Sequence, residues 1–161
     1  MRPIMLATDG SPASAEATRE ALELARALGA SLLVVCVEHV TVPSYGYYGY
    51  ADVYSELRKS EHEHAEQLLE EVAAKAAEAG VGCTTLALEG PVVEEICRAA
   101  RDRGAAMIVM GAHGWGPIRR FVFGSVSTGV LHEAPCPVLI ARPTDPGKTT
   151  WVDEHAAAAS A

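Results

Sequence analysis

The chain lacks the features that mark membrane, secreted and nucleic-acid-binding proteins. No apolar run is long enough to cross a bilayer, and no charged segment followed by an apolar one resembles a signal peptide. Basic residues are few, 13 against 21 acidic residues, and the net charge of −8 disfavours contact with nucleic acid or an anionic membrane surface. We therefore expect a cytoplasmic protein that binds no nucleic acid and does not insert into membranes.

Cysteines and aromatic residues are also scarce. The four cysteines, Cys36, Cys83, Cys97 and Cys136, form no Cys-x-x-Cys pair, which favours free thiols over disulfides or a metal site. We expect the first three to be buried and Cys136, which stands between two prolines, to be more exposed. Aromatic residues make up 6% of the chain and hydrophobic residues 49%, as in a core built from Ala, Val and Leu. A chain of 161 residues corresponds to one domain, which buries about two-thirds of the surface of its unfolded state.

Short apolar runs alternate with segments of helical periodicity, which predicts an α/β fold. Short connections between such segments favour a doubly wound, five-stranded parallel sheet with helices on both faces. Ser11 and Pro12 predict the start of the first helix, and Gly29 predicts its end. We expect one domain over residues 1–143 and a disordered tail over 144–161. The expected strands are 4–7, 31–37, 83–88, 106–110 and 138–141, and the expected helices begin near residues 12, 52, 92 and 126.

A glycine-rich segment joins the fourth expected strand to the last expected helix. Glycines let backbone N–H groups approach a ligand, and a helix start carries partial positive charge, so this arrangement is typical of a phosphate site. Arg119 and Arg120 lie inside the segment, either as phosphate clamps or as solvated loop residues. Ser125 is placed to cap the helix. The segment reads Gly111-Ala112-His113-Gly114, then nine residues, then Gly124-Ser125-Val126-Ser127.

The commoner phosphate-binding motifs do not fit this chain. The dinucleotide fingerprint G-x-G-x-x-G fails because Arg119 stands where its third glycine is needed. The stretch 147–150 reads Gly-Lys-Thr-Thr, like the close of a Walker A loop. However, Arg142 occupies the position of the required first glycine, and an alanine-rich segment follows instead of an amphipathic helix.

The spacing G-x2-G-x9-G-S resembles the ATP-binding signature of the universal stress protein family. The resemblance spans residues 1–142 and includes two further blocks, one at 4–11 (IMLATDGS) and one at 134–140 (APCPVLI). It implies the strand order 3-2-1-4-5, in which the first and fourth strands are neighbours at the switch point of the sheet. Ligands of such sheets bind beyond the carboxyl ends of the strands, so Asp9 and Gly111 would border one crevice.

The resemblance also implies a set of binding residues and their roles. Ala7, Thr8 and Asp9 would border the nucleoside, and the backbone of Val37 would meet the adenine edge. The residues of this set from 110 to 114 and from 124 to 127 would follow the ribose and phosphates. Asp9 fits the ribose hydroxyls or a bound Mg²⁺, and we favour this role over the alternative, an N-terminal cap or Asx-turn at the start of the first helix. The implied cofactors are ATP, with AMP and ADP as alternatives, and Mg²⁺. The implied residues are Ala7, Thr8, Asp9, Val37, Met110, Gly111, His113, Gly114, Gly124, Ser125, Val126 and Ser127.

The function implied by the resemblance is a nucleotide-responsive regulator of stress adaptation without dedicated catalytic activity. The resemblance also implies a homodimer that forms through the last strand, and a protein partner that the sequence does not identify. Two alternatives remain: a slow ATP hydrolase that acts as a switch, and a nucleotide-free dimeric interaction module. The tyrosine-rich segment 43–50 is a lid, a partner-binding patch or a flexible loop. His62 and His64, two residues apart on a helix, point to different faces and are not a chelating pair.

Overall fold

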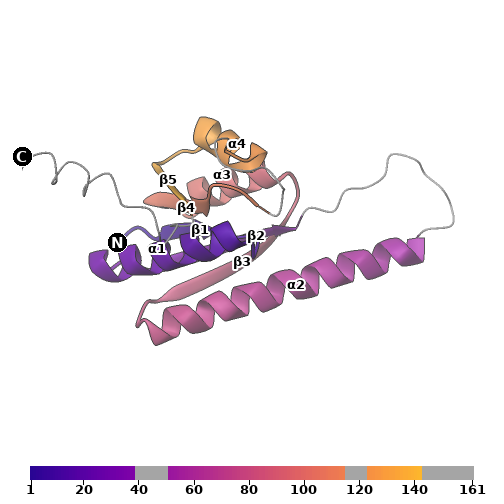
Figure 1. Cartoon of the computed structure of the whole chain (residues 1–161), viewed down its shortest axis with the longest axis horizontal. Helices are drawn as coiled ribbons and strands as arrows, with labels where there is room; N and C mark the ends of the chain where they lie inside the picture. The colour runs from indigo at the N-terminus through magenta and orange to yellow at the C-terminus, as the bar shows by residue number, and fades with distance from the viewer. Residues whose placement is uncertain (39–50, 115–122, 143–161) are drawn as a thin grey trace, which may run out of the picture.

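The computed structural model describes residues 1–38, 51–114 and 123–142 (Figure 1). The tyrosine-rich segment 43–50, Arg119, Arg120 and the tail 144–161 lie outside these ranges. Within them, no helix has the length and apolar character needed to span a bilayer. The elements are β1 (Ile4–Ala7), α1 (Pro12–Leu28), β2 (Leu32–Glu38), α2 (Ala51–Glu78), β3 (Cys83–Glu89), α3 (Val92–Asp102), β4 (Met107–Gly111), α4 (Ser125–Glu133) and β5 (Val138–Ala141).

The predicted doubly wound sheet is confirmed. The five strands are parallel and follow the order β3-β2-β1-β4-β5, so β1 and β4 are neighbours at the point where the order reverses. Figure 1 shows α1 and α2 on one side of the sheet and α3 and α4 on the other. The carboxyl ends of β1 and β4 therefore lie together, with the starts of α1 and α4 close behind them.

Two apolar cores cover the two faces of the sheet, because successive strand residues point to opposite sides. Leu6 and Val34 pack with Val72 in the core beneath α1 and α2. Met5 and Ile108 pack in the core beneath α3 and α4. All five side chains are almost completely buried. Both faces of the central strands are covered by helices, which explains why their sequences are apolar throughout.

The ends of α1 follow the prediction from sequence. The Ser11 hydroxyl accepts a hydrogen bond from the Ser14 backbone N–H at 3.3 Å, and Pro12 occupies the first helical position. Gly29 ends the helix in the left-handed region, with φ of 63°. These residues fix the length of α1 and place its first turn beside the end of β4.

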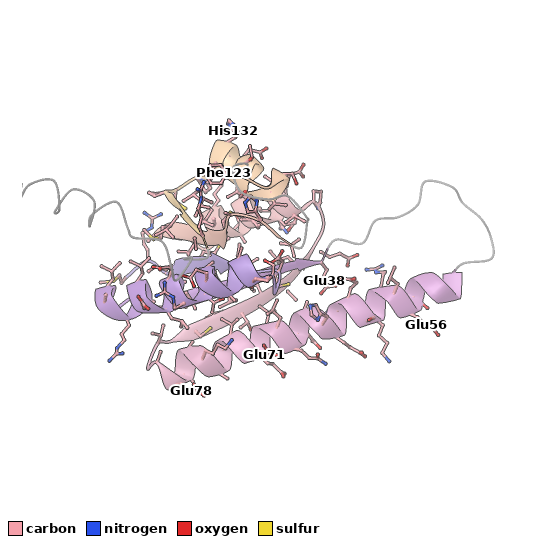
Figure 2. All side chains as sticks on the ribbon, in the orientation of Figure 1. Glu38, Glu56, Glu71, Glu78, Phe123 and His132 are labelled. Carbon is pink, nitrogen blue, oxygen red and sulfur yellow. The ribbon has the colours of Figure 1, made fainter. Side chains whose placement is uncertain are left out.

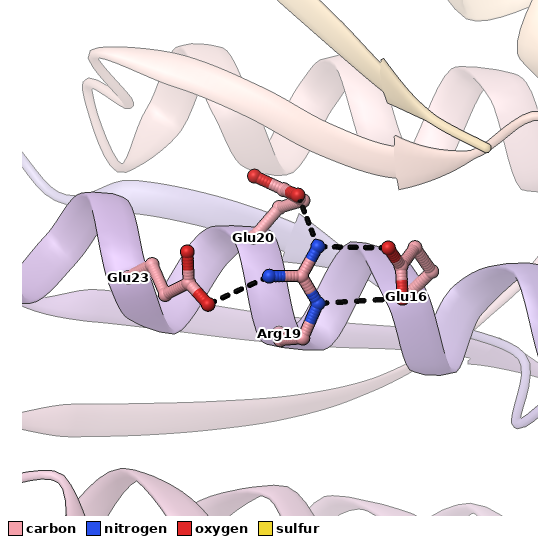
Figure 3. Close-up of polar contacts among 4 residues, drawn as sticks. All are labelled: Glu16, Arg19, Glu20 and Glu23. Atoms are coloured by element: carbon pink, nitrogen blue, oxygen red, sulfur yellow. Dashed lines mark hydrogen bonds and ion pairs between the residues drawn. The ribbon is translucent and has the colours of Figure 1, made fainter. Parts of the chain in front are cut away.

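The outer face of α1 carries a local charge cluster. Arg19 contacts Glu16, Glu20 and Glu23, with nitrogen–oxygen distances of 2.8, 2.5 and 2.7 Å (Figure 3). These side chains lie at the surface, where ion pairs contribute little to stability. We interpret the cluster as a solvated helix face.

The cysteines are free thiols, as the sequence predicts. Cys36 and Cys97 are buried, whereas Cys83 and Cys136 are only half-buried. Burial raises the pKa of the Cys36 thiol to about 11, so this thiol stays protonated at neutral pH. The prediction of a buried thiol therefore holds for Cys36 and Cys97 but not for Cys83, and Cys136 is more exposed than those two, as expected.

Candidate functional site

A cavity of about 440 Å³ lies at the carboxyl ends of the central strands. Its volume falls in the range typical of small-molecule sites. All twelve binding residues that the resemblance implies line it, although β1, β2, β4 and α4 are far apart in sequence. These residues are Ala7, Thr8, Asp9, Val37, Met110, Gly111, His113, Gly114, Gly124, Ser125, Val126 and Ser127.

Five further lining residues were missed by the sequence analysis. Val35 lies two residues before Val37 on the same face of β2, so the period of two along a strand was a usable signal. Val92 and Ile96 lie one turn apart on α3 and add to the apolar side of the cavity. Only the fold brings α3 to this position. The remaining two are Ser14 and Ala112.

The start of α4 presents backbone donors at the cavity that have no partner within the helix. The helix begins at Ser125, and its N-cap is Gly124, so no side chain of the N-cap residue caps the helix. Intrahelical bonding starts with the Thr128 N–H, which donates to the Gly124 carbonyl at 2.9 Å. The N–H groups of Ser125, Val126 and Ser127 therefore precede the first helical hydrogen bond. The prediction that Ser125 caps the helix was wrong, because Gly124 adopts the extended conformation one residue earlier.

Several polar groups of the cavity are already used within the protein. The Ser127 hydroxyl lies 3.0 Å from the carbonyl oxygens of Ala112 and Gly124 and donates its proton there. The Thr8 hydroxyl donates to the Ser14 hydroxyl at 3.1 Å. The Gly124 N–H donates to the Ala112 carbonyl at 2.9 Å. Donors for an anionic ligand therefore come from the backbone of α4 rather than from these hydroxyls.

Asp9 forms the Asx-turn considered above, and its carboxylate also reaches the glycine loop. One carboxylate oxygen accepts a hydrogen bond from the Ser11 N–H at 3.0 Å. The other lies so close to Gly114 that a Cβ atom there would stand 2.6 Å from it. Among the described residues that line the cavity there is no Lys or Arg. Asp9 is the one acidic residue among the described residues that line the cavity.

His113 contributes a buried polar atom to the cavity wall. Its Nδ1 atom is shielded from solvent and has no hydrogen-bond partner among the described residues. Its carbonyl accepts a hydrogen bond from the Ser11 hydroxyl at 3.4 Å, which ties the loop to the start of α1. A buried polar atom without a partner costs about 1–3 kcal/mol.

The glycines of the loop serve different purposes. A Cβ atom at Gly111 would lie 2.7 Å from the Ala13 carbonyl carbon and 2.9 Å from the Ser14 nitrogen, both backbone atoms. Gly111 is therefore required for the close packing of α1 on β4. At Gly124 the nearest atom, the Ala112 carbonyl oxygen, would be 3.5 Å away, an ordinary contact. Gly124 is not required by the packing of this structure.

The fold and the cavity define an α/β protein with a ligand site at the switch point of its sheet. The model of the universal stress protein family matches residues 1–142, and the chain belongs to this family. A universal stress protein of Thermus aquaticus is 39% identical over 142 residues, covering 88% of this chain and 98% of its own length. One from Methanocaldococcus jannaschii is 34% identical over 145 residues, covering 88% and 82%.

Solved structures agree with this assignment. Universal stress protein UspA from Lactobacillus plantarum is 26% identical, covers 88% of this chain and 98% of its own, and superposes with a TM-score of 0.78. Two more distant structures share the fold and contain nucleotides. The universal stress protein from Archaeoglobus fulgidus in complex with dAMP is 23% identical, with coverage of 88% and 98% and a TM-score of 0.64. An Arabidopsis thaliana family member with AMP bound is 20% identical, with coverage of 94% and 97% and a TM-score of 0.67.

Proposed function

We propose that this protein binds an adenine nucleotide, with ATP as the main ligand, and acts as a nucleotide-responsive regulator of stress adaptation. The observation that carries the proposal is the uncapped start of α4, where three N–H groups without helical partners meet the cavity. Such a helix start binds phosphate. The apolar wall formed by Val35, Val37 and Ile96 suits a purine base. Relatives of the same fold that contain dAMP and AMP support an adenine nucleotide as the ligand class.

In this proposal the twelve residues predicted from sequence are the binding residues, and residues 1–143 form the binding domain of a cytoplasmic protein. Calorimetric titration with ATP, ADP, AMP and cyclic AMP in the presence of Mg²⁺ tests it. Saturable binding selective for adenine supports the proposal. Absence of binding to all four would contradict it and favour the nucleotide-free interaction module. Release of phosphate from bound ATP would favour the slow hydrolase.

Mg²⁺ would be held by Asp9 together with phosphate oxygens. The described residues contain no group of three or more metal-binding side chains placed around one point. This fits Mg²⁺, which usually takes one or two carboxylates and completes its shell with phosphate and water. The single carboxylate of the described cavity wall belongs to Asp9. The ion would shield the phosphates from that negative charge.

The role of Asp9 gives a prediction that separates Mg²⁺ from ribose. In Asp9→Asn the side-chain oxygen still accepts the Ser11 hydrogen bond, but the negative charge is gone. We expect the increase in ATP affinity on adding Mg²⁺ to fall roughly tenfold, the size of a lost interaction with a charged group. AMP affinity should change by less than about twofold. Titrations of both nucleotides with Mg²⁺ and with chelator measure this, and an equal loss for ATP and AMP would assign Asp9 to the ribose instead.

A homodimer formed through β5 belongs to the same proposal. β5 is an edge strand that pairs only with β4 in the described sheet, and Val138, Leu139 and Ile140 are partly exposed. An apolar edge strand of this kind is covered in most proteins. A second copy related by twofold symmetry would cover it. Sedimentation equilibrium tests this part, and a monomer at all concentrations would contradict it.

A further inference from the structure

Two ion pairs attach α2 to the carboxyl ends of β2 and β3. The Arg58 guanidinium lies 2.5 and 2.6 Å from the two carboxylate oxygens of Glu89. The His62 Nδ1 atom lies 2.7 Å from Glu38. Arg58 and His62 are four residues apart on one helix, and Glu38 and Glu89 are direct register partners on neighbouring strands. Figure 2 labels Glu38 where the end of β2 approaches α2.

The register of the strands explains why α2 carries two cationic groups here. Carboxylates at directly opposite positions of neighbouring strands repel each other. The Glu38 side chain is only 9% exposed, so its charge is largely removed from water. A carboxylate in this position needs a hydrogen-bonded partner of opposite charge. Arg58 is always charged, whereas His62 provides a full charge only when it is protonated.

Carboxylates surround His62 on more than one side. Glu38 of β2 faces Nδ1, and Glu66 lies 3.4 Å from Nε2 one turn along α2, with Glu63 further away. The hydrogen bond and the charge of Glu38, followed by the charges of Glu66 and Glu63, raise the pKa of His62 above 6.5. The charged pair is therefore fully formed below pH 6.5 and is lost as the pH rises through the elevated pKa.

The attachment of α2 is close to the candidate site. Glu38 directly follows Val37, which lines the cavity from the opposite face of β2, so the two are connected through the strand. Further along α2, Leu68 and His64 lie 3.5 and 3.8 Å from the Cβ position of Gly10, the residue after Asp9. The helix therefore lies beside the end of β2 and the turn after β1, on the face of the sheet opposite the apolar wall of the cavity, and it reaches the cavity through these two segments. Figure 1 shows that the first part of α2 extends past the sheet at this edge.

We propose that His62 is a positioning residue: its protonated side chain holds α2 against the end of β2 and so increases the affinity of the cavity for nucleotide. This inference rests on the proposed function, because it concerns the regulation of the same site. Nucleotide binding and protonation of His62 then favour each other, since the coupling between two sites is reciprocal. The protein would bind its nucleotide more tightly as the surrounding pH falls.

The pH dependence of AMP affinity tests the proposal. Protonation of the AMP phosphate affects all variants alike, so the ratio of wild-type affinity to that of His62→Gln isolates His62. We expect the wild type to bind AMP about two- to fivefold more tightly than His62→Gln near pH 6, the size of a partly exposed ion pair. The ratio should approach one as the pH rises above the elevated pKa of His62, where the side chain is neutral in the wild type as well. A ratio that does not change with pH would overturn the coupling.

Titration of the histidine rings by NMR without nucleotide tests the attachment separately. Glu38→Gln should lower the pKa of His62 clearly, because Glu38 is its main partner. Glu63→Gln, on α2, also removes one negative charge near His62 and should lower the pKa of His62 much less. Equal His62 titrations in the wild type and Glu38→Gln would overturn the attachment. If AMP does not bind at any pH while Glu38→Gln still lowers the pKa of His62, the nucleotide function is contradicted and the attachment of α2 is supported.

Discussion

Replacing Ser125 by proline should weaken the binding of adenine nucleotides roughly 10- to 100-fold without unfolding α4. Proline removes one of the three N–H groups that precede the first hydrogen bond of the helix, and a hydrogen bond to a charged group is worth about 1.5–3 kcal/mol. Proline is well tolerated at the first helical position, where its N–H has no helical partner. Gly124 has φ of −62° and ψ of 162°, the extended conformation that a residue before proline prefers.

Two controls make this prediction specific for phosphate. Ser125→Ala keeps the backbone N–H and removes only the hydroxyl. It therefore distinguishes the contribution of the backbone N–H to nucleotide affinity from that of the side chain. Adenosine lacks phosphate, and its affinity should be the same in the wild type and Ser125→Pro. Circular dichroism and thermal unfolding establish that the variant folds. Unchanged AMP and ATP affinities in a folded Ser125→Pro protein would contradict a phosphate site at α4.

Gly111→Ala should destabilise the fold by about 1–3 kcal/mol or more, the usual cost of overpacking. Its Cβ atom would lie within 3 Å of three backbone atoms at the start of α1, where no side chain can rotate away. Either α1 or β4 must therefore move. Because both carry cavity residues, nucleotide affinity should fall together with stability. Urea unfolding followed by circular dichroism measures the loss.

Gly124→Ala is the matched control for Gly111→Ala. Its Cβ atom would meet only ordinary contacts, and its φ of −62° suits any residue. Alanine is a poorer N-cap than glycine, so we expect a loss below about 1 kcal/mol. Equal stability of the Gly111→Ala and wild-type proteins would contradict the structural role of Gly111. A loss at Gly124 as large as that at Gly111 would contradict the distinction between the two positions.

The elements and most of their ends could be predicted because they depend on local sequence. Ser11, Pro12 and Gly29 act within one turn of α1, and the apolar strands are explained by burial on both faces. The strand order came from the resemblance and was confirmed, whereas local patterns leave the order of parallel strands open. Once the order is known, the end of β1 and the end of β4 must meet. That is why residues about 100 positions apart could be assigned to one crevice.

The details that depend on packing could not be predicted. The capping position moved from Ser125 to Gly124 because the conformation of Gly124, rather than a serine side chain, sets the start of α4. The contribution of Val92 and Ile96 depends on how α3 crosses the sheet. The pairing of His62 with Glu38 joins residues 24 positions apart, and no local pattern indicates it. These features follow from tertiary contacts, and a sequence shows such contacts only after the fold is known.

The most direct test of the nucleotide site is to record the backbone amide signals of the protein by NMR while AMP is added. The account predicts that the amides of Ser125, Val126 and Ser127 shift with a common saturation curve, because their N–H groups bind the phosphate. Adenosine should leave these three signals nearly unchanged while it shifts residues of the apolar wall. Saturable AMP binding that leaves the start of α4 unaffected would contradict the account.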